Sequence, residues 1–182
     1  MKERELVELC QQANNSARKA LYEQYAGRLL ALCLRYVSDR ETAEDLLHDG
    51  FIKIFGVLDK FTWQGEGSLF AWMTRVMTNI VLGYLRKNAV MNRMGRLDDE
   101  PDAYDEPDEA AVERVPEEVL MRFIRELPTG YRTVFNLYVI EEKTHKEIAL
   151  LLGINDKSSA SQLVRARALL AKKVQQWLDC NT

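Results

Sequence analysis

The sequence predicts an all-α protein built of two small helical domains joined by an acidic, flexible linker. Apolar residues recur at spacings of three and four through most of the chain, and no run alternates as a strand would. A strongly acidic segment interrupts this helical pattern near the middle. A chain of 182 residues with 47% hydrophobic content suits two small domains. We expect them at residues 1–92 and 117–182, with the linker at 93–116.

The first domain is expected to hold four helices. The first two run from about residue 3 to 13 and from about 16 to 36. Ser38 is placed to cap the third, whose apolar stripe comprises Ala43, Leu46, Leu47, Ile54, Phe55 and Leu58. Ser68 opens the fourth, whose buried side is expected to comprise Leu69, Trp72, Met73, Val76, Ile80 and Tyr84. Four amphipathic helices of this kind can bury a shared core.

The linker stands out by its charge. Residues 97–118 contain 11 acidic residues and one basic residue, whereas the flanking segments have net charges of +3 and +4. Prolines, few apolar residues and dense like charge prevent such a segment from burying enough surface to fold. It is either a solvated tether or a segment that repels DNA or covers a basic surface until a partner engages.

The second domain is expected to begin with helices at about 116–127 and 128–138. A short helix follows, with Thr144 as its cap and Gly153 as its stop. The segment GINDKSSASQLVRARALLAKK, residues 153–173, then forms a longer helix. A short helix, a turn containing glycine and a longer helix are typical of a helix-turn-helix, whose second helix enters the DNA major groove.

The long helix has two distinct faces. The side expected to be buried comprises Leu163, Ala166, Leu170, Val174 and Trp177, and opposite it lie Ser161, Arg165, Ala168 and Lys172. Ser158 is placed to cap this helix, so that its first amides lie near a DNA phosphate, and small residues allow close approach to a duplex. The alternative is an ordinary cationic face in contact with solvent.

A second basic stripe lies in the fourth helix of the first domain. Arg75, Asn79 and Arg86 share one side, Lys87 lies just beyond, and Trp72 borders them. The preceding loop, FTWQGEGS at residues 61–68, is aromatic and glycine-rich. Rings stack with bases while cations hold the backbone, so this pattern suits single-stranded nucleic acid or one unstacked base. The alternatives are that Trp72 belongs to the core and that Trp63 clamps the loop.

Other classes of protein are disfavoured. The longest stretch without charge is the ten residues between Arg75 and Arg86, short of the roughly 20 that a membrane span needs. The first ten residues have no apolar signal core, and we interpret the protein as cytoplasmic. Three scattered cysteines, Cys10, Cys33 and Cys180, suggest neither a disulfide framework nor a zinc site, and no cofactor is expected.

Three segments in order resemble the extracytoplasmic-function (ECF) sigma factors, the compact two-domain branch of the sigma-70 family. They are AEDLLHDGFIKIF at residues 43–55, SLFAWMTRVMTNIVLGYLRK at 68–87, and LPTGYRTVF followed by THKEIALLLGI and SQLVRARALL. The resemblance implies a transcription initiation factor without catalytic activity. A sigma-2 domain would bind core RNA polymerase and melt the minus-ten element, and a sigma-4 domain would read the minus-thirty-five element. It also implies an anti-sigma factor as partner and a monomer when free.

The resemblance assigns three groups of residues. Those that would contact core polymerase are Asp45, Leu46, Asp49, Phe51 and Ile54. Those that would bind melted minus-ten DNA are Phe61, Trp63, Ser68, Trp72, Arg75, Asn79, Arg86 and Lys87. Those that would bind minus-thirty-five duplex are Ser158, Ser161, Gln162, Val164, Arg165 and Lys172.

The sequence is also compatible with two other functions. A conventional helix-turn-helix regulator would bind duplex DNA alone and would need no melting loop. A carboxylate-bridged metal enzyme would use the carboxylate–histidine spacing found in Glu41, Glu44, Asp45, His48 and Asp49 and again in Glu142 and His145. Such a site also needs carboxylates from two further helices, and Glu142 precedes the turn that holds His145, which disfavours the enzyme.

Overall fold

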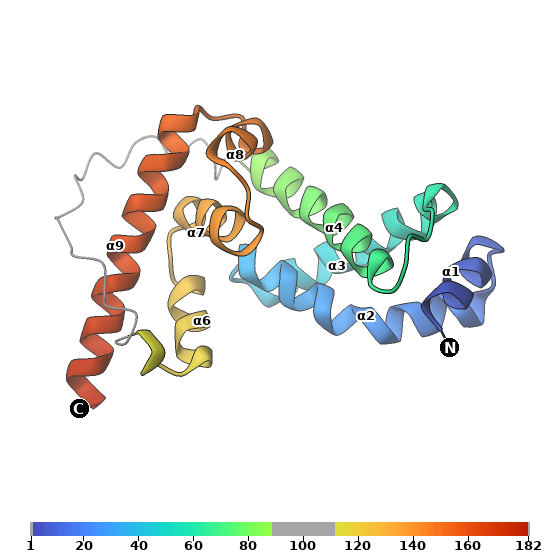
Figure 1. Ribbon diagram of the computed structural model, residues 1–182, viewed down its shortest axis with the longest axis horizontal. Coiled ribbons are helices and arrows are strands. Elements are labelled where there is room, and N and C mark those ends of the chain that lie inside the picture. The colour runs from blue at the N-terminus through green and yellow to red at the C-terminus, as the bar shows by residue number, and fades with distance from the viewer. Residues whose placement is uncertain (1, 89–111, 182) are drawn as a thin grey trace. The chain divides into compact units, whose positions relative to one another are not determined.

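Every regular element of the protein is helical within the residues that the computed structural model describes, 2–88 and 112–181 (Figure 1). The all-α prediction is therefore confirmed. The chain divides into two compact units, Met1–Tyr84 and Leu85–Thr182. The expected domain end at residue 92 and linker residues 93–111 lie outside the described residues. No described helix combines the length and apolar character that a membrane crossing requires.

The first unit is built around four helices and a short turn. They are α1 (Glu3–Gln11), α2 (Asn15–Tyr36), α3 (Arg40–Val57), the 3-10 turn η1 (Leu58–Lys60) and α4 (Ser68–Lys87). The side chain of Asn14 caps α2, since its Oδ1 accepts a hydrogen bond from the Ala17 amide at 3.0 Å. Helix α2 packs against α3, and α3 in turn contacts α4 through Gly50.

The cap of α3 is Asp39, so the predicted cap at Ser38 is wrong. The Asp39 carboxylate accepts hydrogen bonds from the amide of Thr42 at 2.7 Å and from its hydroxyl at 2.6 Å. These bonds lower the pKa of Asp39. Asp39 directly precedes the first helical residue, and a negative charge there also interacts favourably with the helix dipole.

The buried face of α4 is rotated from the one that the sequence predicts. Leu69 and Met73 are buried as expected, and the face continues through Met77, Val81 and Leu85. The expected core residues Trp72, Val76, Ile80 and Tyr84 are half-buried. The physical reason lies at Gly50, where a methyl group would overlap the thioether of Met77. A missing side chain on α3 thus lets the Met77 side of α4 approach closely.

Two of the three cysteines lie within the core of the first unit. Cys10 and Cys33 are buried, whereas Cys180 is exposed near the end of the chain. Burial raises the pKa of Cys33 to about 12 and also raises the pKa of Cys10. Both buried thiols are therefore protonated near neutral pH.

From Glu117 to Asn181, the second unit contains four helices and a π-helical turn. They are α6 (Glu117–Arg125), α7 (Thr129–Phe135), the turn η2 (Asn136–Ile140), α8 (His145–Leu152) and α9 (Asp156–Asn181). The buried residues of one core cluster are Val115, Phe123, Val174 and Leu178. The sequence places Val115 in the expected linker, but burial of its side chain makes it part of this core.

The helix-turn-helix is formed by α8 and α9 and is held by local hydrogen bonds. Thr144 and Glu147 form a reciprocal capping box at the start of α8, and Gly153 ends it with a φ of 69°, as predicted. The predicted cap at Ser158 is wrong, because α9 begins at Asp156 and the Ser158 amide donates to Asn155 Oδ1 at 2.6 Å. Asparagine at this position caps a helix as well as serine does.

Candidate nucleic-acid interface

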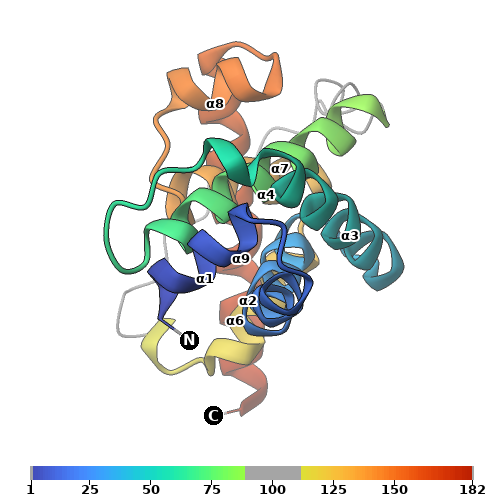
Figure 2. The same ribbon diagram turned by 90° about the vertical axis from the view of Figure 1, so that its right-hand side faces the viewer.

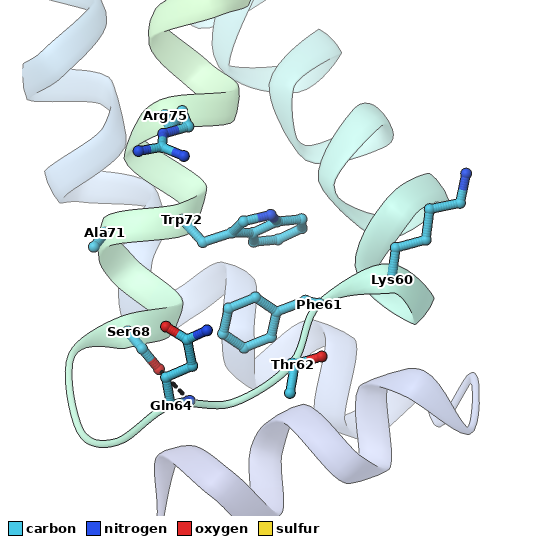
Figure 3. Close-up of a pocket in the computed structure, with 8 residues that line it drawn as sticks. All are labelled: Lys60, Phe61, Thr62, Gln64, Ser68, Ala71, Trp72 and Arg75. Atoms are coloured by element: carbon cyan, nitrogen blue, oxygen red, sulfur yellow. Dashed lines mark hydrogen bonds between the residues drawn. The ribbon is translucent and has the colours of Figure 1, made fainter.

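A pocket opens between the start of α4 and the loop that precedes it (Figure 3). Its volume is about 460 Å³, within the roughly 300–1,000 Å³ typical of sites for small molecules. The rings of Phe61 and Trp72 meet with centroids 5.0 Å apart and planes inclined by 41°. The residues that line the pocket are Lys60, Phe61, Thr62, Gln64, Ser68, Ala71, Trp72 and Arg75.

The chemistry of the pocket suits an aromatic, polar-edged ligand beside a phosphate. The half-buried Trp72 supplies a ring, while the amide of Gln64 and the hydroxyl of Thr62 supply hydrogen-bonding groups. Lys60 and Arg75 are exposed at the pocket, and neither has an acidic partner within salt-bridge distance among the described residues. Of the predicted minus-ten residues, Phe61, Ser68, Trp72 and Arg75 are brought together here.

Trp63 lies in the same loop but does not line the pocket. Its indole Nε1 donates a hydrogen bond to Glu3 Oε1 at 3.1 Å, and the guanidinium of Arg4 lies 5.6 Å from its ring centroid. The structure therefore places Trp63 as a clamp that holds the loop to α1 and not as a wall of the pocket. The clamp is the alternative that the sequence left open.

The remaining predicted minus-ten residues follow the exposed side of α4. Asn79 lies one turn after Arg75, and both side chains are exposed. Arg86 and Lys87 are also exposed, near the end of the helix. The stripe therefore leads away from the pocket along α4. Asn79 itself does not line the pocket.

The structure corrects the predicted polymerase contacts on α3. Leu46 and Phe51 are almost fully buried and Ile54 has no exposed surface, so these three side chains offer a partner very little area. Phe51 instead packs against Tyr22 with ring centroids 4.6 Å apart. Asp45 and Asp49 are exposed as expected.

The exposed side of α3 includes an apolar residue that sequence reasoning missed. Ile52 is 72% exposed and lies three positions after Asp49 and seven after Asp45, on the same face. His48 and Lys53 are exposed beside it. Its spacing from the two aspartates was the available signal, but the richer apolar pattern on the opposite face concealed it.

The predicted duplex-binding residues of α9 are divided by burial. Ser161 and Lys172 are exposed, Val164 is 57% exposed, and Ser158 and Arg165 are half-buried. Gln162 is 5% exposed and is therefore not available for base contacts, which corrects that assignment. Its neighbour Leu163 is buried as well.

No group of three or more histidine, cysteine or acidic side chains in the described parts of the chain is placed to hold a metal ion. Glu142, half of one proposed carboxylate–histidine pair, lies before α8 and has a positive φ of 53°. His145 instead stacks with Tyr138 and lies 2.9 Å from the hydroxyl of Ser159. These contacts give His145 a place in the helix-turn-helix.

Comparison with known proteins adds independent findings. Residues 21–90 match the family described as Sigma-70 region 2, and residues 117–170 match Sigma-70, region 4, so that the matches together span more than half of the chain. The RNA polymerase sigma-H factor of Pseudomonas aeruginosa is 25% identical over 186 residues, covering 97% of this chain and 95% of that protein.

Further relatives carry similar descriptions. The ECF RNA polymerase sigma factor SigM of Bacillus subtilis is 25% identical, covering 82% of this chain and 90% of that protein. A solved structure of the sigma factor RpoE with the anti-sigma factor NepR from Bartonella quintana aligns with a TM-score of 0.47 and 19% identity, covering 90% of this chain and 98% of that chain. The matched families are those of transcription factors and not of known enzymes. The chain therefore belongs to the sigma-70 family of RNA polymerase sigma factors, in its extracytoplasmic-function branch.

Proposed function

We propose that this sigma factor binds core RNA polymerase, directs it to specific promoters and stabilises the melted DNA, without covalent chemistry of its own. Each of three surfaces binds a different partner. The exposed side of α3 binds polymerase, the pocket and the exposed side of α4 bind the melted minus-ten strand, and the exposed face of α9 binds the minus-thirty-five duplex.

The observation that carries the proposal is the pocket between the loop and α4. A base inside a duplex cannot reach a concave site of this kind, whereas an unstacked base can enter and stack with a ring. Phe61 and Trp72 supply the rings, and the exposed Lys60 and Arg75 supply positive charge for the adjoining phosphates. Capture of the base shifts the equilibrium toward the melted state, because the pocket binds the melted strand alone.

Beyond the pocket, toward the end of α4, the helix offers a path for the rest of the strand. Arg75, Asn79 and Arg86 recur along one exposed side, so that successive phosphates and base edges can meet a cation, an amide and a second cation. Asn79 is suited to base edges because its amide both donates and accepts hydrogen bonds.

On α3, Ile52 is proposed as the apolar anchor for polymerase. Protein interfaces depend on a few apolar or aromatic residues that become fully buried, surrounded by polar ones that exclude water. Ile52 has the exposed surface to be such an anchor, and Asp45 and Asp49 form its charged surroundings. A basic surface on polymerase would complement these carboxylates.

On α9, Ser161, Val164, Arg165 and Lys172 are proposed to meet the upstream duplex. Val164 can contact a thymine methyl group, and Arg165 can reach a guanine edge or a phosphate. Lys173 belongs to a different surface, because its Nζ lies 2.6 Å from Glu126 Oε2 within the same unit. An anti-sigma factor is proposed as the regulator, as the family resemblance implies.

Transcription with bacterial core polymerase tests the proposal. With the protein present, a fragmented genomic library should yield new starts that share two spaced upstream motifs. The Asn79→Ala variant should reduce permanganate reactivity of unpaired thymines at those starts while polymerase binding stays intact, and Gln24→Ala, on the exposed side of α2, is the matched control. No new starts, together with tight and salt-sensitive duplex binding by the protein alone, would favour the stand-alone regulator.

A further inference from the structure

The two ends of helix α1 contact the two ends of the pocket loop, residues 61–68. The two views show α1 running alongside that loop (Figures 1 and 2). At the end of α1, Gln11 Nε2 donates hydrogen bonds to the carbonyl of Leu58 at 3.0 Å and to that of Phe61 at 2.8 Å. At its beginning, Glu3 contacts the other end of the loop. The pocket wall is thus attached to a helix that lies 47 to 66 residues away in sequence.

Glu3 is a buried carboxylate with only 8% of its surface exposed. Its Oε1 accepts hydrogen bonds from Trp63 Nε1 at 3.1 Å and from the Leu69 amide at 3.4 Å. The Gly67 amide lies 3.1 Å from each of the two carboxylate oxygens, and the Tyr25 hydroxyl lies 3.4 Å from Oε2. A buried charge is costly without such partners, so these contacts account for its presence.

These contacts give α4 a cap that its own sequence lacks. The Gly67 carbonyl accepts the first helical hydrogen bond, from Ala71, so Gly67 occupies the capping position. Its φ of 86° favours glycine, and glycine has no side chain with which to cap. Glu3 supplies the missing acceptor from α1, and its negative charge suits the start of a helix.

We infer that Glu3 and Gln11 are positioning residues that hold the loop in the conformation needed to capture a base, an inference that rests on the proposed function. Gln11 fixes the backbone of Phe61, and Glu3 fixes the backbone on both sides of Ser68. Both Phe61 and Ser68 line the pocket. Holding the loop before DNA arrives reduces the conformational entropy lost when the base binds.

Hydrogen exchange in the full-length free protein tests the positioning directly. In the wild type, the amides of Gly67 and Leu69 should be protected. In Glu3→Ala they should exchange at least about tenfold faster, because the hydrogen bonds to a charged acceptor are lost. The amides of Thr42 and Glu147, capped by Asp39 and Thr144, should be unchanged. Unprotected Gly67 and Leu69 in the wild type would overturn the inference.

Promoter melting by the holoenzyme tests the consequence. Glu3→Ala should lower the melted fraction about tenfold without weakening polymerase binding, the size expected when charged hydrogen bonds are lost. Glu3→Gln should stay within about threefold of wild type, since its amide oxygen can replace Oε1. Glu5→Ala, an exposed glutamate in the same first turn, is the matched control and should melt DNA normally. If Glu3→Gln is as defective as Glu3→Ala, charge and not positioning explains the effect.

Gln11 provides a test that does not depend on a buried residue. Gln11→Glu replaces a donor with a carboxylate that faces two carbonyl oxygens, so the melted fraction should fall by about threefold or more. Gln12→Glu adds the same charge at the neighbouring exposed position and should have no effect. Equal melting by Gln11→Glu and Gln12→Glu would overturn the role of Gln11. If the wild type initiates normally and all the α1 variants also melt DNA normally, the positioning role is rejected and the proposed function stands. If the wild type initiates nowhere, the proposed function is rejected.

Discussion

The pocket in the first unit and the exposed face of α9 in the second are proposed to bind the same polymer in two different states. The pocket is concave and aromatic, which suits a single unstacked base. The α9 face combines Ser161, Val164 and Lys172 on a helix that can enter a groove. Each surface suits one form of DNA, because the α9 face can enter the groove of a duplex, whereas the pocket can admit a base only after that base has left the duplex.

The two surfaces are also held in place differently. The helix starts within the helix-turn-helix are fixed by near neighbours, such as Thr144 with Glu147 and Asn155 with Ser158. The pocket loop depends on Glu3 and Gln11, which lie far away in sequence. The turn before α9 is therefore capped by residues next to it, whereas the base pocket also needs α1 in place.

The largest expected effect separates core from surface on α3. Ile54→Ala should destabilise the first unit by about 2–5 kcal/mol, because a fully buried side chain leaves a cavity. Ile52→Ala should change stability by less than about 0.5 kcal/mol but weaken polymerase binding, because it removes an exposed anchor. Urea unfolding followed by tryptophan fluorescence and a polymerase binding titration would measure the two effects. Loss of polymerase binding by a stably folded Ile54→Ala would contradict the assignment.

The next effect concerns the pocket. Trp72→Ala should weaken capture of the melted strand by up to about 3 kcal/mol, because stacking on its ring is lost. Upstream duplex contact should be unchanged, since that surface lies in the other unit. Binding of holoenzyme to a forked minus-ten template and to a minus-thirty-five duplex would separate the two. Trp177→Ala, a half-buried tryptophan of α9, is the matched control, and equal losses on the forked template would refute the pocket.

A smaller effect is expected on the α9 face. Arg165→Ala should weaken upstream promoter binding by at least about 1 kcal/mol if the guanidinium meets a base or a phosphate. On promoters whose minus-thirty-five element is scrambled, wild type and Arg165→Ala should bind equally if Arg165 recognises the sequence of that element. Melting on a forked template that lacks this element should be unaffected, and a defect there would place Arg165 outside the duplex surface.

The smallest expected effect is a dependence on pH in the second unit. The hydrogen bond from Lys173 lowers the pKa of Glu126, so the unfolded chain binds a proton more readily than the folded one. The resulting stability is present near neutral pH and is lost as the pH falls through the pKa of the folded carboxyl group. Both side chains are partly exposed, so the contribution should stay below about 0.5 kcal/mol. The free energy of unfolding of Lys173→Met, measured from neutral to acidic pH, should lack the pH-dependent contribution of Glu126.

Local signals in the sequence predicted local features well. Thr144 and Gly153 were identified as the bounds of α8 because a capping residue and a left-handed glycine act on their immediate neighbours. The two wrong caps, Ser38 and Ser158, failed where Asp39 and Asn155 competed for the same role nearby. The nature of the cap was thus predictable, but the choice between adjacent candidates was not.

Features that depend on packing between distant residues could not be predicted from the sequence. The orientation of α4 depends on the close approach of Met77 to Gly50, and nothing in the local pattern around Gly50 indicates which side of α4 it meets. The role of Glu3 depends on a contact across more than sixty residues, and its pattern in the sequence is that of an ordinary solvated glutamate. The exposure of Ile52 followed only once the opposite face of α3 was known to be buried.

The contrast between the cysteines has a practical consequence for experiments on the two units. A maleimide reacts with the thiolate, which is scarce at the buried Cys10 and Cys33 because burial raises the pKa of both thiols. Cys180 is exposed near the end of α9, beyond the proposed duplex contacts. A single fluorophore can therefore be attached there without mutating the protein, and its anisotropy would follow the tumbling of the second unit during promoter engagement.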